Sequence, residues 1–235
     1  MTGPCLLLTR PRADSVRLAA LLQARGWQTL VDPLLEIRPL PVDLPDLQGV
    51  QAVLLTSRHA APALAALPRP LPVHCVGEAT ASAARRLTTA PVFAGPGDAV
   101  GMARQLAATL WPADGALLHL AGAEHRPELK AGLDAAGFTL IQRIVYRALP
   151  ARGLMAETRQ ALAEGAVQAV LLFSPRTASL FAALSQELDL SRTEALCLSA
   201  NVAVALPAER LRRVRVATRP EEAALLDLLE APAPE

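Results

Sequence analysis

The sequence predicts an α/β protein with two domains, each built on an open parallel β-sheet, in which the second domain is inserted into the first. Short apolar strands alternate with alanine-rich helices along the chain, which is the pattern of parallel sheets flanked by helices. Two segments recur in the same order: 52–57 (AVLLTS) returns as 169–174 (AVLLFS), and 75–81 (CVGEATA) returns as 197–203 (CLSANVA). Two extended segments, 33–41 and 141–150, separate the inner series of elements from the outer one.

The first elements form a β-α-β unit. Residues 6–9 are a short apolar strand, and apolar residues at helical spacing predict a helix over 14–25 that ends at Gly26. Residues 27–31 are the second strand. Segment 33–41 contains three prolines and is therefore predicted to be extended but not central in a sheet.

The remaining elements continue the alternation of strand and helix. In the inner series, strands are predicted at 52–57, 73–77, 92–94 and 116–120, and helices at 58–67, 78–87, 99–110 and 126–136. In the last part of the chain, helices are predicted at 155–164, 176–184, 201–206 and 220–229, strands at 169–174, 195–199 and 214–217, and a frayed tail at 231–235.

Segment 141–150 (IQRIVYRALP) contains the only tyrosine, Tyr146. Its imperfect alternation of apolar and charged residues fits a connector partly open to water, and it could pair with 33–41. With 36–41 and 141–149 as connecting strands, residues 1–35 and 150–235 form the outer domain and residues 42–140 the inserted domain. Ligands of such sheets bind at the carboxyl ends of the strands, where this sequence has hydroxyls and arginines.

Composition excludes several classes of protein. A hydrophobic fraction of 52% with 19% charged residues indicates a globular protein. A net charge of +1 and few aromatic residues argue against nucleic acid binding. No apolar run approaches the roughly 20 residues of a membrane span, and the start lacks the basic region of a signal peptide. We therefore expect a cytoplasmic protein, and a monomer, because no long apolar stripe demands a partner.

Cofactor and metal signals are weak. The three cysteines form no C-x-x-C pair and lie in apolar runs, which is typical of buried reduced thiols. The four histidines lack the spacing of metal ligands. The glycine-rich segment 95–101 differs from a dinucleotide loop in the place of its last glycine. Lys130 is the only lysine, so the other basic side chains are arginines, which suit an acidic small molecule but could also reflect coding bias.

Six short motifs together resemble the uroporphyrinogen-III synthase family. They occur in the family's order at 7–11 (LLTRP), 55–57 (LTS), 76–81 (VGEATA), 126–129 (RPEL) before Gly137, 145–147 (VYR) and 173–175 (FSP). The resemblance covers nearly the whole chain. The sequence departs from the family at Ser199 and Val202, where many members have a glycine and a threonine, so no hydroxyl can act at position 202.

The resemblance implies two flavodoxin-like domains joined by a two-stranded β ladder. It also implies a reaction in tetrapyrrole (haem) biosynthesis: the linear tetrapyrrole hydroxymethylbilane loses water and closes to uroporphyrinogen III with inversion of the terminal (D) ring. Family members need no metal or organic cofactor.

A polycarboxylate tetrapyrrole should be bound by arginines, hydroxyls and helix N-termini. The candidates are Arg10, Arg12, Thr56, Ser57, Thr80, Arg147, Ser174 and Ser199. Each hydroxyl could equally cap a helix, and the two roles are compatible. The resemblance places the family's tyrosine at Tyr146, whose phenol can donate a proton to the departing hydroxyl. Packing of a connector tyrosine against a domain is the alternative.

Two other functions fit parts of the pattern. A small-ligand binding or sensor protein without catalysis can also consist of two α/β domains on two connections. A transferase that uses a nucleotide sugar would need a larger chain and a clearer phosphate loop.

Overall fold

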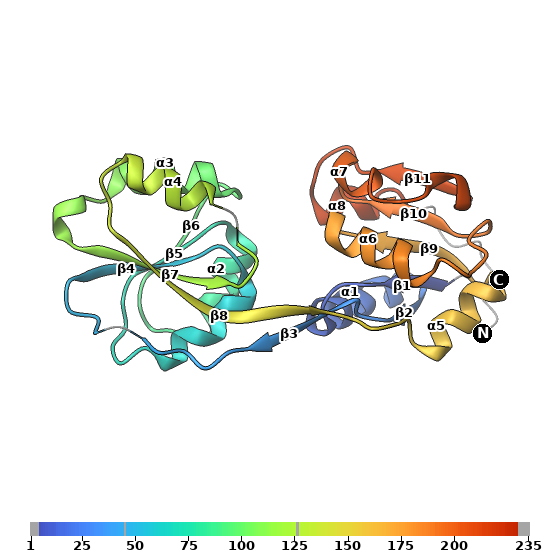
Figure 1. The fold of residues 1–235 in the computed structure, drawn as a ribbon, viewed down its shortest axis with the longest axis horizontal. Coiled ribbons are helices and arrows are strands. Elements are labelled where there is room, and N and C mark those ends of the chain that lie inside the picture. Colours follow the sequence, from blue (N-terminus) through green and yellow to red (C-terminus); the bar gives the residue numbers. More distant parts are fainter. Residues whose placement is uncertain (1–4, 45, 126, 230–235) are drawn as a thin grey trace. The chain divides into compact units, whose positions relative to one another are not determined.

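The computed structural model describes residues 5–44, 46–125 and 127–229. Arg126, at the start of the helix predicted over 126–136, and the predicted frayed tail at 231–235 lie outside these residues. The chain divides into two compact units: unit 1 comprises Met1–Glu36 and Leu149–Glu235, and unit 2 comprises Ile37–Ala148. The elements of both are labelled in Figure 1.

Unit 1 is built on a five-stranded sheet in the order β11-β10-β9-β1-β2, and all of its strand pairs are parallel. The strands are β1 (Cys5–Leu8), β2 (Gln28–Val31), β9 (Val167–Leu172), β10 (Glu194–Cys197) and β11 (Arg213–Val216). The helices are α1 (Arg12–Gln23), α5 (Ala156–Ala163), α6 (Pro175–Leu184), α7 (Ala200–Ala203), η3 (Ala208–Arg210) and α8 (Glu222–Leu226).

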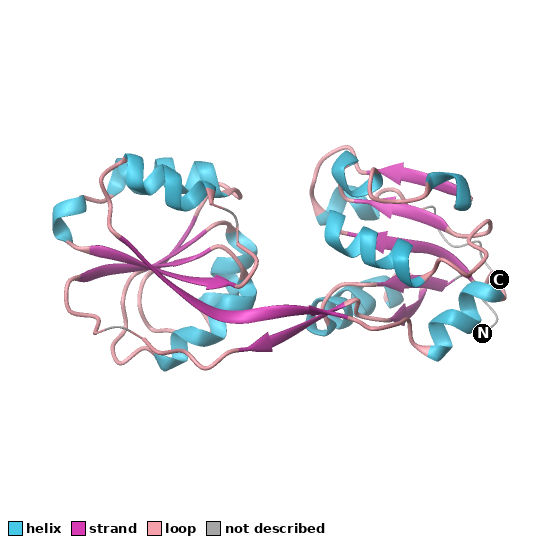
Figure 2. Ribbon diagram, in the orientation of Figure 1, coloured by secondary structure: helices cyan, strands magenta, loops and turns pink. Residues whose placement is uncertain are grey.

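Alternate residues of each strand in unit 1 enter different hydrophobic clusters, because successive side chains of a strand point to opposite faces of the sheet. Leu7 and Val170 pack with α5, α6 and α7 on one face. Leu8 and Leu171 pack with α1 and α8 on the other. The sheet is therefore a buried layer between helices, as Figure 2 shows.

Unit 2 has the same three-layer construction. Its six-stranded sheet has the order β3-β8-β7-β4-β5-β6. The strands are β3 (Leu35–Pro39), β4 (Val50–Leu55), β5 (Val73–Cys75), β6 (Val92–Ala94), β7 (Ala116–Gly122) and β8 (Leu140–Pro150). The helices η1 (Arg58–Ala66) and α2 (Glu78–Ala84) share a hydrophobic cluster with one face. The helices α3 (Ala99–Thr109) and α4 (Glu128–Ala135) share one with the other face, and η2 spans Pro112–Asp114.

The two units are circularly permuted copies of one sheet. β4 and β9 have the same sequence, VQAVLL. In space, β8-β7-β4-β5-β6 repeats the order β2-β1-β9-β10-β11. Along the chain, however, the strand pair β1 and β2 precedes β9, whereas the equivalent pair β7 and β8 follows β4. The predicted fold class, with two mainly parallel sheets flanked by helices, is confirmed.

The two extended segments pair with each other at both ends. In unit 1, the backbone N–H of Ala151 donates to the carbonyl of Leu34 at 3.0 Å, and in unit 2 the N–H of Leu40 donates to the carbonyl of Val145 at 2.9 Å. The interpretation of 141–149 as a connecting strand alone needs correction. Residues 140–146 also pair in parallel with β7, from Leu117 opposite Leu140 to Gly122 opposite Tyr146, so β8 is a full strand of the unit 2 sheet.

Several predicted helices differ from the observed ones. Residues 58–66 form a 3₁₀ helix rather than an α-helix, and this segment contains Pro62, which has no N–H for an α-helical hydrogen bond. α7 and α8 are only four and five residues long. Within the described residues, no helix combines the length and apolar character needed to cross a membrane.

Candidate functional site

The carboxyl ends of the strands in unit 2 surround a cavity of about 420 Å³. Its lining comes from the ends of β4, β5, β7 and β8, the loop after β6 and the starts of α3 and α4. The lining residues are Thr56, Ser57, Val76, Gly97, Asp98, Ala99, Val100, His119, Gly122, Glu124, His125, Glu128, Leu129 and Tyr146. The cavity thus lies where ligands of open parallel sheets bind, and it brings together the predicted site residues Thr56, Ser57 and Tyr146.

Tyr146 presents a half-buried phenol to this cavity from β8. Its ring meets the ring of His59 edge to face, with 5.8 Å between the centroids. Burial raises the pKa of the phenol, the hydrogen bond with Ser57 opposes the rise, and the carboxylate of Glu124 adds to it. The phenol therefore stays protonated at neutral pH and can act as a proton donor.

Gly122, at the end of β7, makes room for this ring. A Cβ built on Gly122 would lie 2.5 Å from Cζ and 2.7 Å from Oη of Tyr146. Gly122 has no positive φ, so the glycine is required by this close approach and not by its backbone conformation. Gly122 was not among the predicted site residues, and no motif in the sequence around it signals this contact.

A group of polar side chains adjoins the phenol. His119 is buried, with 2% of its surface exposed, and its Nε2 lies 3.0 Å from Oγ1 of Thr56. The amide Nε2 of Gln142 lies 2.6 Å from Nε2 of His125, and Nδ1 of His125 lies 3.0 Å from the carbonyl of Gly122. Because a carbonyl only accepts, Nδ1 of His125 carries the proton.

His119 is a neutral ring in this environment. Burial lowers its pKa to about 4, the electrostatic influence of the neighbouring His125 ring adds to the decrease, and the nearby amide of Gln142 opposes it. Nδ1 of His119 has no hydrogen-bond partner among the described residues. The spacing of the histidines in the sequence argued against metal ligands, but it gave no sign of this arrangement around the cavity. In the described part of the chain, no group of three or more His, Cys, Asp or Glu side chains is placed to hold a metal ion.

The glycine-rich segment 95–101 supplies another wall of the cavity. Asp98 caps α3 by accepting a hydrogen bond from the N–H of Gly101 at 2.8 Å, and Gly97 has a φ of +107°, a conformation that glycine adopts at little cost. The sequence showed that segment 95–101 differs from a dinucleotide loop, but it did not show that this segment lines the cavity.

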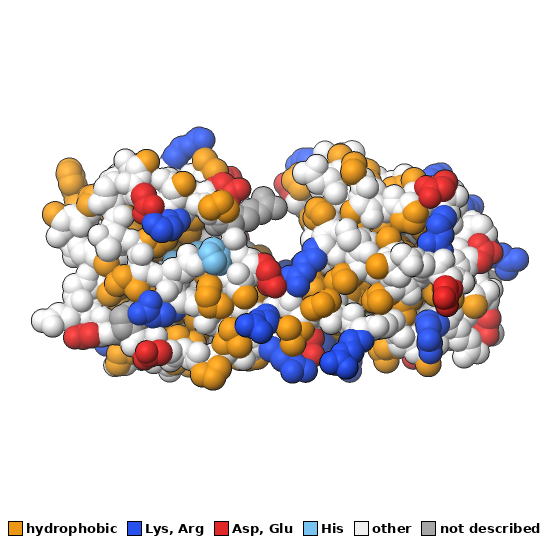
Figure 3. Space-filling view, in the orientation of Figure 1, with side chains coloured by type: hydrophobic (Ala, Val, Ile, Leu, Met, Phe, Trp, Pro, Cys, Tyr) orange, Lys and Arg blue, Asp and Glu red, His pale blue; other side chains and the backbone are white. Residues whose placement is uncertain are grey.

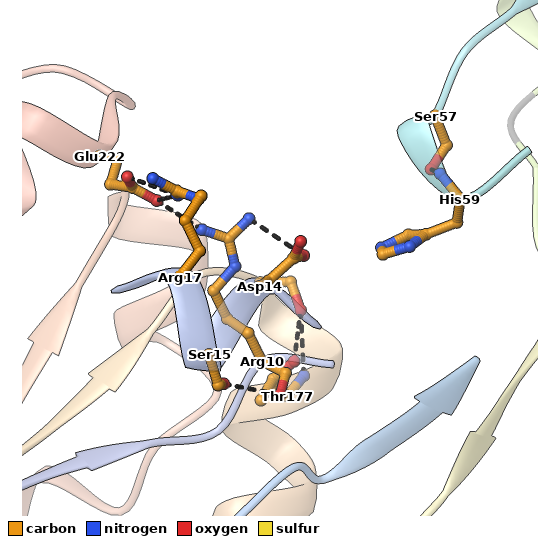
Figure 4. Close-up of polar contacts among 9 residues, drawn as sticks. Arg10, Asp14, Ser15, Arg17, Ser57, His59, Thr177 and Glu222 are labelled. Atoms are coloured by element: carbon orange, nitrogen blue, oxygen red, sulfur yellow. Dashed lines mark hydrogen bonds and ion pairs between the residues drawn. The ribbon is translucent and has the colours of Figure 1, made fainter. Parts of the chain in front are cut away.

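In unit 1, Arg10 lies at the end of β1 within a cluster of charges (Figure 4). Its guanidinium contacts the carboxylate of Glu222 at 2.7 Å and that of Asp14 at 3.4 Å. It also lies over the ring of Phe173, 4.3 Å from the centroid. Arg17 contacts Glu222 at 2.6 Å. Arg10 therefore binds a carboxylate of its own chain.

The other predicted site residues are less closely grouped. Ser174 caps α6, accepting a hydrogen bond from the N–H of Thr177 at 3.2 Å, whereas Ser199 is the N-cap of α7 without a side-chain cap bond. Arg12 is the exposed first residue of α1. Arg147 is exposed next to Tyr146 on β8 and so points to the opposite face. Thr80 is buried in α2 with 6% of its surface exposed, and it does not line the cavity.

Comparisons with known proteins agree with this architecture. The chain resembles a solved structure described as uroporphyrinogen-III synthetase from Helicobacter pylori, with a TM-score of 0.66 and 18% identity over 96% of this chain and 97% of the other. It resembles a mutant uroporphyrinogen III synthase from the extremely thermophilic bacterium Thermus thermophilus with a TM-score of 0.52 and 19% identity over 96% of each chain. A search of curated protein sequences gave no match.

At such low identities, the two structural matches establish the fold alone. The family assignment comes from a sequence comparison: residues 16–227 match the model of the family described as uroporphyrinogen-III synthase HemD. This match includes Thr56, which directly follows β4, as well as His119 of β7 and Tyr146 of β8. The chain belongs to the uroporphyrinogen-III synthase family.

Proposed function

We propose that the chain converts hydroxymethylbilane to uroporphyrinogen III, losing water and inverting the terminal ring, in haem biosynthesis. Membership of the family over residues 16–227 is the observation that carries this proposal. The cavity at the strand ends of unit 2, with the protonated phenol of Tyr146, supports it by providing a proton donor at a site where a substrate can bind.

In the proposed first step, Tyr146 donates its proton to the hydroxyl group of the substrate. The C–O bond breaks, water leaves, and the substrate becomes an azafulvene cation. A general acid of this kind contributes roughly 10²- to 10⁴-fold to a rate. The substituted carbon of the terminal ring then attacks the cation and forms a spiro intermediate, and the bond between this carbon and its original methylene bridge breaks, which moves the cation to that methylene. The unsubstituted α-carbon of the terminal ring attacks this second cation and closes the macrocycle with the ring inverted, and the proton lost from that carbon can return to the phenolate.

The remaining contribution is geometric. Spontaneous closure gives the type I isomer, so the protein must hold the bilane with the substituted carbon next to the cation. Positioning of reacting groups can supply roughly 7–11 kcal/mol. We propose that Thr56 and Ser57 contact the substrate in the unit 2 cavity, and that Arg10, Arg12, Arg147, Ser174 and Ser199 bind its carboxylates. The contact between Arg10 and Glu222 supports a carboxylate site there. Thr80, which is buried and is not among the residues that line the unit 2 cavity, stays a proposed contact of the substrate.

We further propose that the protein acts as a cytoplasmic monomer without nucleic acid. The three cysteines are free and buried, which fits a reducing compartment. The formal net charge of +1 does not favour a polyanionic partner.

The proposed function is tested by the isomer of the product. Freshly prepared hydroxymethylbilane is incubated with the protein and the resulting uroporphyrinogen is analysed as types I and III. We expect type III to dominate. Only type I, as in a protein-free blank, would reject the synthase activity and leave a binding protein.

A further inference from the structure

The internal duplication allows one unit to serve as the reference for the other. In unit 1, Leu8 of β1 lies opposite Leu171 of β9 and opposite Val31 of β2. Phe173 follows Leu171 by two residues on the same chain segment. All of these side chains belong to one hydrophobic cluster.

The equivalent positions in unit 2 are polar. His119 of β7 lies opposite Leu54 of β4 and opposite Gln142 of β8, and Thr56 follows Leu54 by two residues. Because β4 and β9 have the same sequence, Leu54 of unit 2 is equivalent to Leu171 of unit 1, and the residues paired with them can be compared directly. Leu8, Val31 and Phe173 of unit 1 thus correspond to His119, Gln142 and Thr56 of unit 2.

The fold does not require these polar groups, since unit 1 builds the same sheet with apolar ones. Burying a polar group without a full set of hydrogen bonds is unfavourable. His119 nevertheless has 2% of its surface exposed, and its Nδ1 lacks a partner among the described residues. His119 therefore makes folding less favourable than the leucine at the equivalent position of unit 1 would. Its presence is explained by a role other than folding.

The geometry indicates what this role is. Nε2 of His119 lies 3.0 Å from Oγ1 of Thr56, and both residues line the unit 2 cavity. This contact fixes the rotation of the Thr56 side chain. A threonine hydroxyl has one donor and two acceptor sites, so after its bond to His119 it can still bond a group in the cavity.

We propose that His119 is a positioning residue of the synthase, which holds the Thr56 hydroxyl in the orientation that contacts the tetrapyrrole. This inference rests on the proposed function. Because the ring is neutral, it orients Thr56 without adding a positive charge to the cavity.

The test compares His119→Leu, which restores the unit 1 residue, with His119→Gln and His119→Asn. The amide of glutamine reaches about as far as Nε2 of histidine, whereas that of asparagine reaches only as far as Nδ1. For each variant, kcat, KM for hydroxymethylbilane and the thermal midpoint are measured. Thr56→Val and the double variant with His119→Leu complete the set.

We expect His119→Leu to raise the thermal midpoint by a few degrees and yet lower kcat/KM roughly tenfold, the effect of one neutral hydrogen bond. His119→Gln should recover most of the loss and His119→Asn little of it. The double variant should be no worse than either single variant, because both remove the same contact.

Three results would overturn the inference: full activity of His119→Leu, equal activity of the glutamine and asparagine variants, or a lower midpoint of His119→Leu, which would show a structural role. The wild-type reaction separates the two proposals. If the wild type forms only the type I isomer, the proposed function fails; if it forms type III and one of the three results is found, only the role of His119 fails.

Discussion

Burial sets the chemistry of the individual side chains in the unit 2 cavity. It raises the pKa of Tyr146 and lowers that of His119, since a low-dielectric environment disfavours the charged form of either group. Both side chains are therefore neutral at pH 7, the phenol with a proton to donate. Sequence alone indicated Tyr146 through the family motif, but it could not show His119, whose role depends on a neighbour 63 positions away.

Replacement of Tyr146 by phenylalanine tests the proton donor. Phenylalanine keeps the ring that packs against Gly122 and His59 and removes only the hydroxyl. We expect kcat to fall on the order of 100-fold, within the range of general acid catalysis, with an unchanged circular dichroism spectrum. Because the pKa of the phenol is raised above its usual value, wild-type kcat should show no decrease from Tyr146 ionisation between about pH 7 and 9. Unchanged turnover of the variant would remove the acid role.

Gly122→Ala tests the placement of the same ring. The added methyl group would overlap the phenol, with 2.5 Å to Cζ, and a rigid ring can relieve the contact only by moving. We expect kcat to fall roughly 10- to 100-fold, as when a reacting group is displaced by about 1 Å.

Gly153→Ala is the matched control, because nothing lies within 4 Å of its built Cβ and its φ is not positive. Its activity should equal that of the wild type. If both alanine variants keep wild-type kcat, the position of the phenol is not limited by Gly122.

At the scale of elements, the contacts of Glu222 connect α8 to β1 and α1 in unit 1. Glu222 of α8 contacts Arg10 at the end of β1 and Arg17 of α1. Burial alone would raise the pKa of Glu222, but Arg17 and Arg10 outweigh it and hold the pKa below its usual value. A helix of five residues is too short to be stable alone, so this contact helps to hold α8 in place.

Glu222→Gln should therefore lower the free energy of unfolding by roughly 1 kcal/mol at pH 7. A carboxyl whose pKa is lowered in the folded state stabilises the protein above its unfolded pKa, about 4.3, and this stabilisation is lost as pH falls through the folded pKa. The difference between variant and wild type should thus shrink as pH falls below the unfolded pKa and vanish once pH lies below the lowered folded pKa of Glu222. The measurement is chemical denaturation at several pH values.

Glu221→Gln is the control for this variant. Glu221 is exposed and 3.9 Å from Arg219, so its replacement should have little effect on stability. A Glu222→Gln effect that is independent of pH, or no larger than that of Glu221→Gln, would contradict the account of the cluster.

The strands were easier to predict than the helices. Apolar runs such as 167–172 identify buried strands directly. Short helices lack a full period of apolar residues, so the ends of α7 and α8 were predicted too far along the chain. The 3₁₀ form of residues 58–66 depends on local geometry around Pro62 and the Ser57 cap, which hydrophobic periodicity does not report.

At the scale of the whole molecule, the two units share the same sheet but differ in the side chains at the carboxyl ends of its strands. The motif echoes at 52–57 and 169–174 were visible in the sequence, but the permutation was not, because β1 and β7 share a position in the sheet without sharing a motif. Charged side chains of both signs are interspersed on the visible face of each unit (Figure 3), as expected for a net charge of +1. The two copies differ in the polar side chains around the unit 2 cavity, His119, Gln142 and Thr56. These side chains are brought together by the pairing of neighbouring strands, which the sequence did not reveal.

The central claim is that this chain directs hydroxymethylbilane to the type III isomer. It is tested most directly by following the isomer ratio while the protein concentration is raised from zero at a fixed amount of freshly prepared substrate. The account predicts that the type III fraction rises with protein concentration from the blank value until type III is the main product. A ratio that stays at the blank value at every concentration would contradict it.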